Sequence, residues 1–139
     1  MERRALESNN NLRSARFIYN LLAKLGPKKC AFCECDIPQL IQGAHIWPVA
    51  SIKKEHQLTL EEKLVHATSR DNGIWLCENH HKLFDENLLT IESAGKVEFS
   101  DKIAETSLTY LTNSTPKTVL DPEIVNENVE FYITKRYSN

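Results

Sequence analysis

The hydrophobic and polar positions of the chain follow periods that predict a mixture of helices and short strands. In residues 3–25 the apolar side chains recur mostly at spacings of three and four, which is the repeat of one helix face. Gly26-Pro27 then ends the helix. The short apolar runs 40–47 and 73–76 are expected to be strands, and Asp71-Asn72-Gly73 is a turn signal before the second.

Residues 59–139 predict four more helices and a β-hairpin. Thr59-Leu-Glu-Glu62 fits a capping box and predicts a short helix over residues 60–67. Helices are also expected over residues 78–85 and near 101–111, with a β-hairpin of 88–91 and 96–99 between them. A last helix is expected to begin at Asp121-Pro122. Its apolar face would consist of Ile124, Val125, Val129, Tyr132 and Ile133.

Length and composition fit one small α+β domain spanning residues 1–139. The chain is 41% hydrophobic, and no apolar run approaches the roughly 20 residues of a membrane helix. The N-terminal stretch has no apolar signal core, so we expect a cytoplasmic protein with no membrane partner. A domain this small gains stability from a bound metal.

The formal net charge of −2 hides an asymmetry along the chain. Residues 1–29 carry seven basic and two acidic side chains, whereas residues 71–139 carry six basic and twelve acidic ones. The basic part could lie on phosphates while the acidic part faces solvent. A solvated helix face explains the same charges and, on charge alone, is the simpler interpretation.

Two pairs of metal-ligand residues have the spacing of a zinc site. Cys30-x-x-Cys33 and Cys77-x-x-His80 each allow a tight turn to aim two ligands at one ion, and zinc takes four such ligands tetrahedrally. The alternative is a set of buried free thiols with an unrelated histidine. Cys35 is the spare cysteine; it could replace Cys33, but we interpret it as a small, partly buried thiol. A closed four-ligand zinc has no open position for substrate, so this site is expected to be structural.

A second ligand pair lies on the helix predicted over residues 78–85, which also carries His80. Neighbours on a helix diverge by roughly 100°, so His81 should face away from the ion that His80 binds. Asp85 follows His81 by four residues and therefore shares its face. Together they form a possible two-ligand clamp for a divalent ion, with water and a phosphate oxygen in the remaining positions.

Gly43-Ala-His-Ile-Trp-Pro48, followed by the run from Asp71-Asn72-Gly73 through Cys77 and His80-His81 to Asp85, resembles the HNH endonuclease motif. The resemblance covers about residues 28–92 and is closest to the branch found in bacterial restriction and phage-defence nucleases. It implies a ββα-metal hairpin with a structural zinc site, flanked by an N-terminal and a C-terminal helix. The name-giving residues are His45, Asn72 and His81.

The resemblance also implies a role for each of these residues. His45 would be the general base that activates water, since an unperturbed imidazole titrates near pH 6.5. Asn72 would orient His45 or the backbone of the strand and turn. His81 and Asp85 would bind the catalytic ion, which we expect to be Mg²⁺, with Mn²⁺ or Ni²⁺ as alternatives. Many family members have a metal ligand just before the base, where this chain has Ala44.

We therefore expect a metal-dependent endonuclease that hydrolyses DNA. A homodimer, or a partner or further domain, would supply specificity. The alternatives are a non-catalytic zinc-knuckle module that binds DNA or protein, and an assembly protein in which zinc only stabilises the fold. Outside the motif, His56 and His66 are expected on the surface, and Trp47 and Trp75 in the core.

Overall fold

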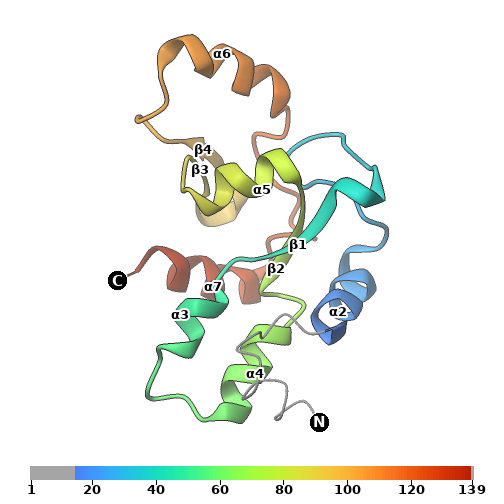
Figure 1. Ribbon diagram of the computed structural model, residues 1–139, viewed down its shortest axis with the longest axis vertical. Coiled ribbons are helices and arrows are strands. Elements are labelled where there is room, and N and C mark those ends of the chain that lie inside the picture. The colour runs from blue at the N-terminus through green and yellow to red at the C-terminus, as the bar shows by residue number, and fades with distance from the viewer. Residues whose placement is uncertain (1–14, 139) are drawn as a thin grey trace.

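The centre of the computed structural model is an antiparallel hairpin, which Figure 1 shows between α2 and α5. The structure is described for residues 15–138. β1 (Ile41–His45) follows a 3₁₀ turn, η1 (Pro38–Leu40), and pairs with β2 (Gly73–Cys77). The register runs from Ile41 opposite Cys77 to His45 opposite Gly73. The two predicted strands are confirmed, with slightly different ends.

Helix α2 (Ala15–Leu25) packs on one face of this hairpin because two glycines leave room for it. A Cβ atom on Gly73 would lie 2.5 Å from Cζ of Phe17, and one on Gly43 would lie 2.8 Å from Cδ1 of Ile18. Larger residues at either position would force the helix away. The predicted helix 3–25 is confirmed from Ala15 onward, and its earlier part lies outside the described residues.

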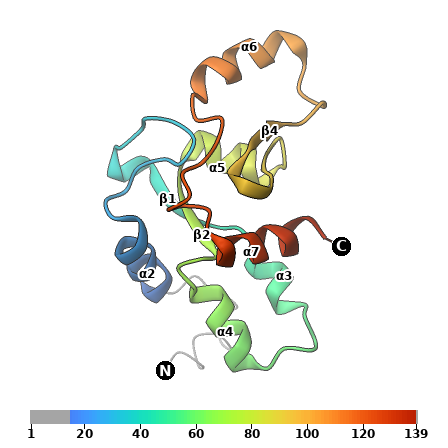
Figure 2. The same cartoon turned by 180° about the vertical axis from the view of Figure 1, so that it is seen from behind.

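Helix α5 (Glu78–Asp85) begins directly after β2 and has the predicted bounds. It packs against β1 and β2, and it also contacts β3 (Leu89–Ile91). Seen from behind, α7 (Glu127–Tyr137) runs close to the end of the hairpin, with α3 and α4 below it (Figure 2). The hairpin and α5 thus form the expected ββα unit, and helices flank it on the N-terminal and C-terminal sides.

The connection between β1 and β2 contains two helices. α4 (Leu60–Thr68) has the predicted capping box: the Thr59 hydroxyl accepts from the Glu62 amide, and the Glu62 carboxylate accepts from the Thr59 amide. α3 (Val49–Lys53) was not predicted, because one turn and a half gives too short a pattern to recognise. It follows Pro48, whose carbonyl accepts the first backbone bonds of the helix.

The β3–β4 hairpin and α6 lie toward one end of the molecule (Figure 1). β3 pairs antiparallel with β4 (Val97–Phe99) across the turn η2 (Ser93–Gly95), as predicted. α6 (Glu105–Ser114) begins and ends later than the predicted 101–111, and none of its residues is buried. With no apolar face to bury, the sequence carries little information on where this helix starts.

The expected start of the last helix at Asp121-Pro122 is wrong. α7 begins at Glu127, and its N-cap is Asn126, whose side chain accepts from the Val129 amide. Asp121 instead accepts from the amides of Ile124 and Val125 through its carbonyl, in a turn that precedes the helix. Two capping signals lie five residues apart, and the second one forms the helix.

Both tryptophans are buried, as expected, and His56 is exposed. The prediction of a surface position for His66 is wrong. Its ring is half-buried among Trp47, Phe131 and Tyr132, and Nδ1 lies 2.8 Å from the Tyr132 hydroxyl. These partners come from segments distant in sequence, which a local pattern does not show. Within the described residues, no helix is long and apolar enough to cross a membrane.

Candidate metal centres and active site

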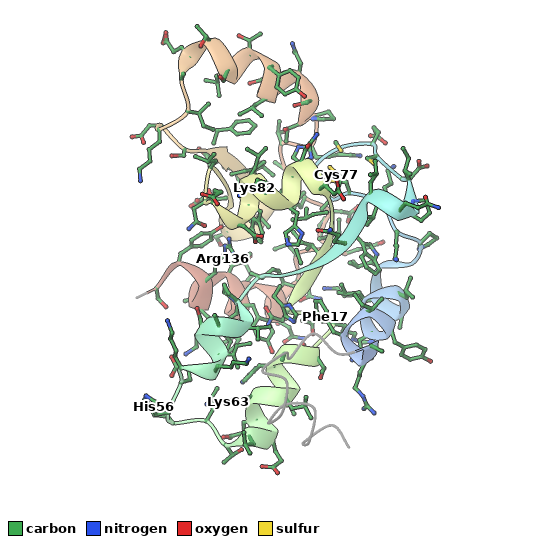
Figure 3. The ribbon with its side chains drawn as sticks, viewed as in Figure 1. Phe17, His56, Lys63, Cys77, Lys82 and Arg136 are labelled. Carbon is green, nitrogen blue, oxygen red and sulfur yellow. The ribbon has the colours of Figure 1, made fainter. Side chains whose placement is uncertain are left out.

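The two predicted zinc pairs come together at the junction of β2 and α5. Sγ of Cys30, Cys33 and Cys77 and a ring nitrogen of His80 all lie within 4.8 Å of one another. The knuckle that carries Cys30 is held against β2 because the Ala31 amide donates to the Trp75 carbonyl at 2.8 Å. Cys77 is the last residue of β2, and His80 lies in the first turn of α5. Figure 3 shows the sulfur atoms gathered near the labelled Cys77.

The distances within this cluster fit a tetrahedral zinc ion. Zn–S bonds of about 2.3 Å and Zn–N bonds of about 2.0 Å place sulfurs about 3.8 Å apart and sulfur and nitrogen about 3.6 Å apart. The Cys33 and Cys77 sulfurs are 3.9 Å apart. His80 Nδ1 lies 3.6 Å from Cys30 Sγ and 3.3 Å from Cys77 Sγ. The three thiols and one imidazole are therefore compatible with a structural zinc site.

Burial favours the neutral forms of Cys30, Cys33 and His80. It raises the pKa of the Cys30 thiol to about 12 and also raises the pKa of Cys33. It lowers the pKa of His80, which favours the neutral imidazole that a metal requires. Because metal binding must displace the thiol protons, affinity for the ion should rise with pH.

His80 has a hydrogen-bond partner that orients its ring. Its Nε2 lies 2.9 Å from the hydroxyl of Thr115, just after α6, while its Nδ1 faces the sulfurs. If Nδ1 binds the ion, Nε2 carries the proton and donates to Thr115, as metal-bound histidines commonly do to a neighbouring oxygen. Thr115 was not predicted, because nothing in its local sequence indicates this contact.

His81 points to a different place from His80, as the helical geometry predicts. It is buried, and its Nε2 lies 3.5 Å from Oδ2 of Asp85, one turn further along α5. Its Nδ1 lies 2.5 Å from Oε1 of Gln42 on β1. Asp85 is exposed, whereas Nε2 of His81 is buried.

The His81–Asp85 pair has donors suited to a divalent ion. Neighbouring ligands in an octahedron with bonds of about 2.1 Å lie about 3 Å apart. The observed separation of 3.5 Å is close to that value, and the exposed Asp85 side chain is free to adjust. Two protein ligands leave positions for water and for a phosphate oxygen.

His45, at the end of β1, is buried against α2. Its ring stacks on Phe17, with centroids 3.9 Å apart and planes 13° apart. Its Nε2 lies 2.7 Å from the Ala67 carbonyl at the end of α4. Since a carbonyl oxygen can only accept, Nε2 carries the proton, and the buried Nδ1 is the basic nitrogen of the neutral ring.

Asn72 is completely buried and ties together the backbone around His45. Its Oδ1 accepts from the Trp47 amide at 2.7 Å, and its Nδ2 donates to the carbonyls of Trp47 and His66. Its backbone carbonyl accepts from Ile46. The sequence left two roles open for Asn72, and its side chain hydrogen-bonds to the backbone of the strand and turn.

The structure does not bring all the predicted catalytic residues to one face. Alternate residues of a strand point to opposite sides. Gly43 and His45 face α2, whereas Gln42 reaches His81 on α5. His45 therefore lies on the α2 side of the hairpin, whereas His81 lies on the α5 side.

Arg136 on α7 joins the ends of the two elements that carry these residues. Its guanidinium donates to the carbonyl of Ile46, next to His45, and to the carbonyl of Phe84, next to Asp85. Figure 3 labels Arg136 between α5 and α7. It follows Tyr132 and Ile133 on one helix face, so a basic residue among apolar ones was the only sequence signal for it.

Comparison with known proteins agrees with this geometry. Residues 30–92, which contain both ligand sets, match the family model described as HNH endonuclease. Over these residues the chain is similar to HNH endonucleases. The HNH segment thus includes the β1–β2 hairpin, α5 and β3.

One solved structure is also similar to the chain. A modification-dependent TagI restriction endonuclease has 21% sequence identity and a TM-score of 0.48, over 94% of this chain. This chain spans only 40% of the length of that one. No curated protein matches the chain.

Proposed function

We propose that this protein is a metal-dependent endonuclease that hydrolyses phosphodiester bonds in DNA. Its role would be restriction or phage defence in the cytoplasm, with a second copy, a partner or a further domain providing sequence specificity. The observation that carries the proposal is the presence of two distinct ligand sets that meet at α5, within a segment that matches HNH endonucleases.

The two ligand sets would divide structural from catalytic work. The Cys30–Cys33–Cys77–His80 cluster supplies four ligands and has no position for substrate, so zinc there would hold the knuckle, β2 and α5 together. His81 and Asp85 would bind the catalytic ion, with Mg²⁺ favoured and Mn²⁺ or Ni²⁺ as alternatives. An ion at this position would stabilise the charge on the scissile phosphate and help the 3′-oxygen to leave.

His45 would act as the general base through Nδ1. The Ala67 carbonyl fixes the proton on Nε2, so Nδ1 is the nitrogen that would accept a proton from water. Phe17 holds the ring plane, and Asn72 holds the backbone that follows His45. Because Nδ1 is buried, catalysis requires water to gain access to this nitrogen when DNA binds.

One observation favours a second candidate function, a zinc-stabilised binding module without catalysis. His45 packs on Phe17, on the face of the hairpin away from His81. A histidine that only fills the space between α2 and α4 would have these same contacts. The two functions differ in whether removing the His45 imidazole lowers the rate of DNA cleavage.

The test is incubation of supercoiled plasmid with the zinc-loaded protein in Mg²⁺, Mn²⁺, Ni²⁺ or EDTA. We expect nicking or cleavage with a divalent ion and none in EDTA. His45→Ala should lower the rate by about 10²–10⁴-fold, the usual contribution of a general base. The matched control is His56→Ala, since His56 is exposed and outside the motif. Absence of cleavage with every ion favours the binding module, and cleavage by His45→Ala at the rate of His56→Ala removes the base assignment.

A further inference from the structure

The contact between Gln42 and His81 links the strand β1 to the predicted catalytic metal ligand. Oε1 of Gln42 lies 2.5 Å from Nδ1 of His81, and the two residues are 39 positions apart in the chain. Gln42 lies one full strand repeat before Ala44, so both belong to the same side of β1. This is the strand face toward α5.

The direction of this hydrogen bond fixes the tautomer of His81. An amide oxygen can only accept, so Nδ1 of His81 must carry the proton and donate it to Gln42. In a neutral imidazole the other nitrogen then carries the lone pair that can bind a cation. That nitrogen is Nε2, which lies 3.5 Å from Oδ2 of Asp85.

The two partners lie on different sides of the His81 ring, which decides what Gln42 does. An ion held by Nε2 and Asp85 would be on the side of the ring away from the bond to Gln42. Gln42 is therefore placed to hold the ring and not to coordinate the same ion. Histidine ligands generally donate their second N–H to such an oxygen, which raises ligand basicity and fixes ring orientation.

We propose that Gln42 is a positioning residue that holds His81 as the Nδ1–H tautomer and aims Nε2, together with Asp85, at a divalent cation. This inference rests on the proposed function of the His81–Asp85 pair. It also gives β1 a part in the metal site, although Ala44 has no ligand atom. The strand contributes an oxygen to the far side of the imidazole.

Three variants separate this role from simple packing. Gln42→Leu keeps a side chain of similar size but removes the accepting oxygen, whereas Gln42→Glu keeps an oxygen that accepts the same N–H. Gln57→Leu is the matched control, because Gln57 is another exposed glutamine, in the loop between α3 and α4. All proteins are loaded with zinc first, so that the thiolate site is filled and Mn²⁺ reports on the second site.

The first measurement is the ¹⁵N NMR of the His81 ring in zinc-loaded protein without Mn²⁺. We expect the Nδ1–H tautomer in wild type, Gln42→Glu and Gln57→Leu, and a shift toward the Nε2–H tautomer in Gln42→Leu. The second is Mn²⁺ binding by calorimetry. Gln42→Leu should bind about 10–100-fold more weakly, the usual loss when such a partner is removed. Gln42→Glu should bind at least as tightly as wild type.

The outcomes distinguish the inference from the function on which it rests. An unchanged tautomer and unchanged Mn²⁺ affinity in Gln42→Leu would overturn the role of Gln42 and leave the nuclease proposal standing. Failure of wild type itself to bind Mn²⁺ and to cleave plasmid would overturn both. An equal loss of Mn²⁺ affinity in Gln42→Leu and Gln42→Glu would also overturn the inference, because the accepting oxygen would then not explain the effect.

Discussion

The guanidinium of Arg136 lies on the ring of Phe84, with its central carbon 3.7 Å from the ring centroid. The same group donates to the Phe84 carbonyl at 2.6 Å and to the Ile46 carbonyl at 2.9 Å. A cation at this position donates hydrogen bonds to a carbonyl at the C-terminal end of α5 and interacts favourably with the helix dipole. It also fixes the distance between the ends of β1 and α5, which carry His45 and Asp85.

Replacing Arg136 should therefore destabilise the junction of β1, α5 and α7. Arg136→Met should lower the free energy of unfolding by about 2–4 kcal/mol, since hydrogen bonds to a charged group contribute roughly 1.5–3 kcal/mol each and are not additive. Arg136→Lys should lose less stability than Arg136→Met, because the ammonium keeps the positive charge. It should still be less stable than wild type, because an ammonium lacks the fork that reaches both carbonyls. Urea unfolding measures both. Lys82→Met is the control, since Lys82 is exposed and pairs with Glu86 at the surface. Equal stability of Arg136→Met and Lys82→Met would contradict the role given to Arg136.

Zinc should co-purify with the protein at about one ion per chain. Cys30→Ser or Cys77→Ser should give insoluble or unfolded protein, because binding of a structural zinc supplies folding free energy. Elemental analysis and circular dichroism measure the two effects. Cys35→Ser is the matched control: Cys35 lies near the knuckle but outside the four-ligand cluster, so its zinc content should be unchanged. Folded wild type without zinc would show that the cluster is not a metal site.

Stability should fall as the pH drops below about 6.5, partly because of His66. Burial lowers the pKa of His66, and Lys135 adds to this while Glu62 opposes it. Between its folded-state pKa and the unfolded value of about 6.5, the unfolded chain binds more protons at this site. The contribution of neutral His66 to the free energy of unfolding is therefore complete above about pH 6.5 and is lost as the pH falls through the folded-state pKa.

The measurement is urea unfolding at about pH 7.5 and about pH 5.5, compared between wild type and His66→Gln. Because zinc release also depends on pH, the difference between the two proteins is what matters. His66→Gln should lose less stability on acidification than wild type does. An identical loss in both proteins would show that His66 is not responsible for any of it.

The parts of the site that the sequence predicted depend on local spacing. Three positions separate the two ligands of each zinc pair, and four separate His81 from Asp85. A single turn or helix is therefore enough to place the members of each pair together. The capping box at Thr59 and Glu62 is local in the same way. Strands β1 and β2 followed from their short apolar runs and the Asn72–Gly73 turn.

The parts that the sequence did not predict depend on contacts between distant segments. Gln42 meets His81 across 39 positions, and Arg136 meets Ile46 across 90. No local period marks either residue as functional. The position of His45 against Phe17 likewise follows from α2 packing over two glycines, which only the folded arrangement shows.

The most direct test of this account compares His80→Ala with His81→Ala. His80 Nδ1 faces the cysteine sulfurs, whereas His81 faces Gln42 and Asp85. Zinc content, thermal stability and plasmid cleavage in Mg²⁺ are measured for both variants and for Asp85→Ala. The account predicts that His80→Ala loses zinc and stability. It predicts that His81→Ala keeps both but no longer cleaves DNA, and that Asp85→Ala behaves like His81→Ala with partial rescue by high Mn²⁺. Cleavage by His81→Ala at the wild-type rate, or loss of zinc from His81→Ala while His80→Ala stays folded, would contradict it.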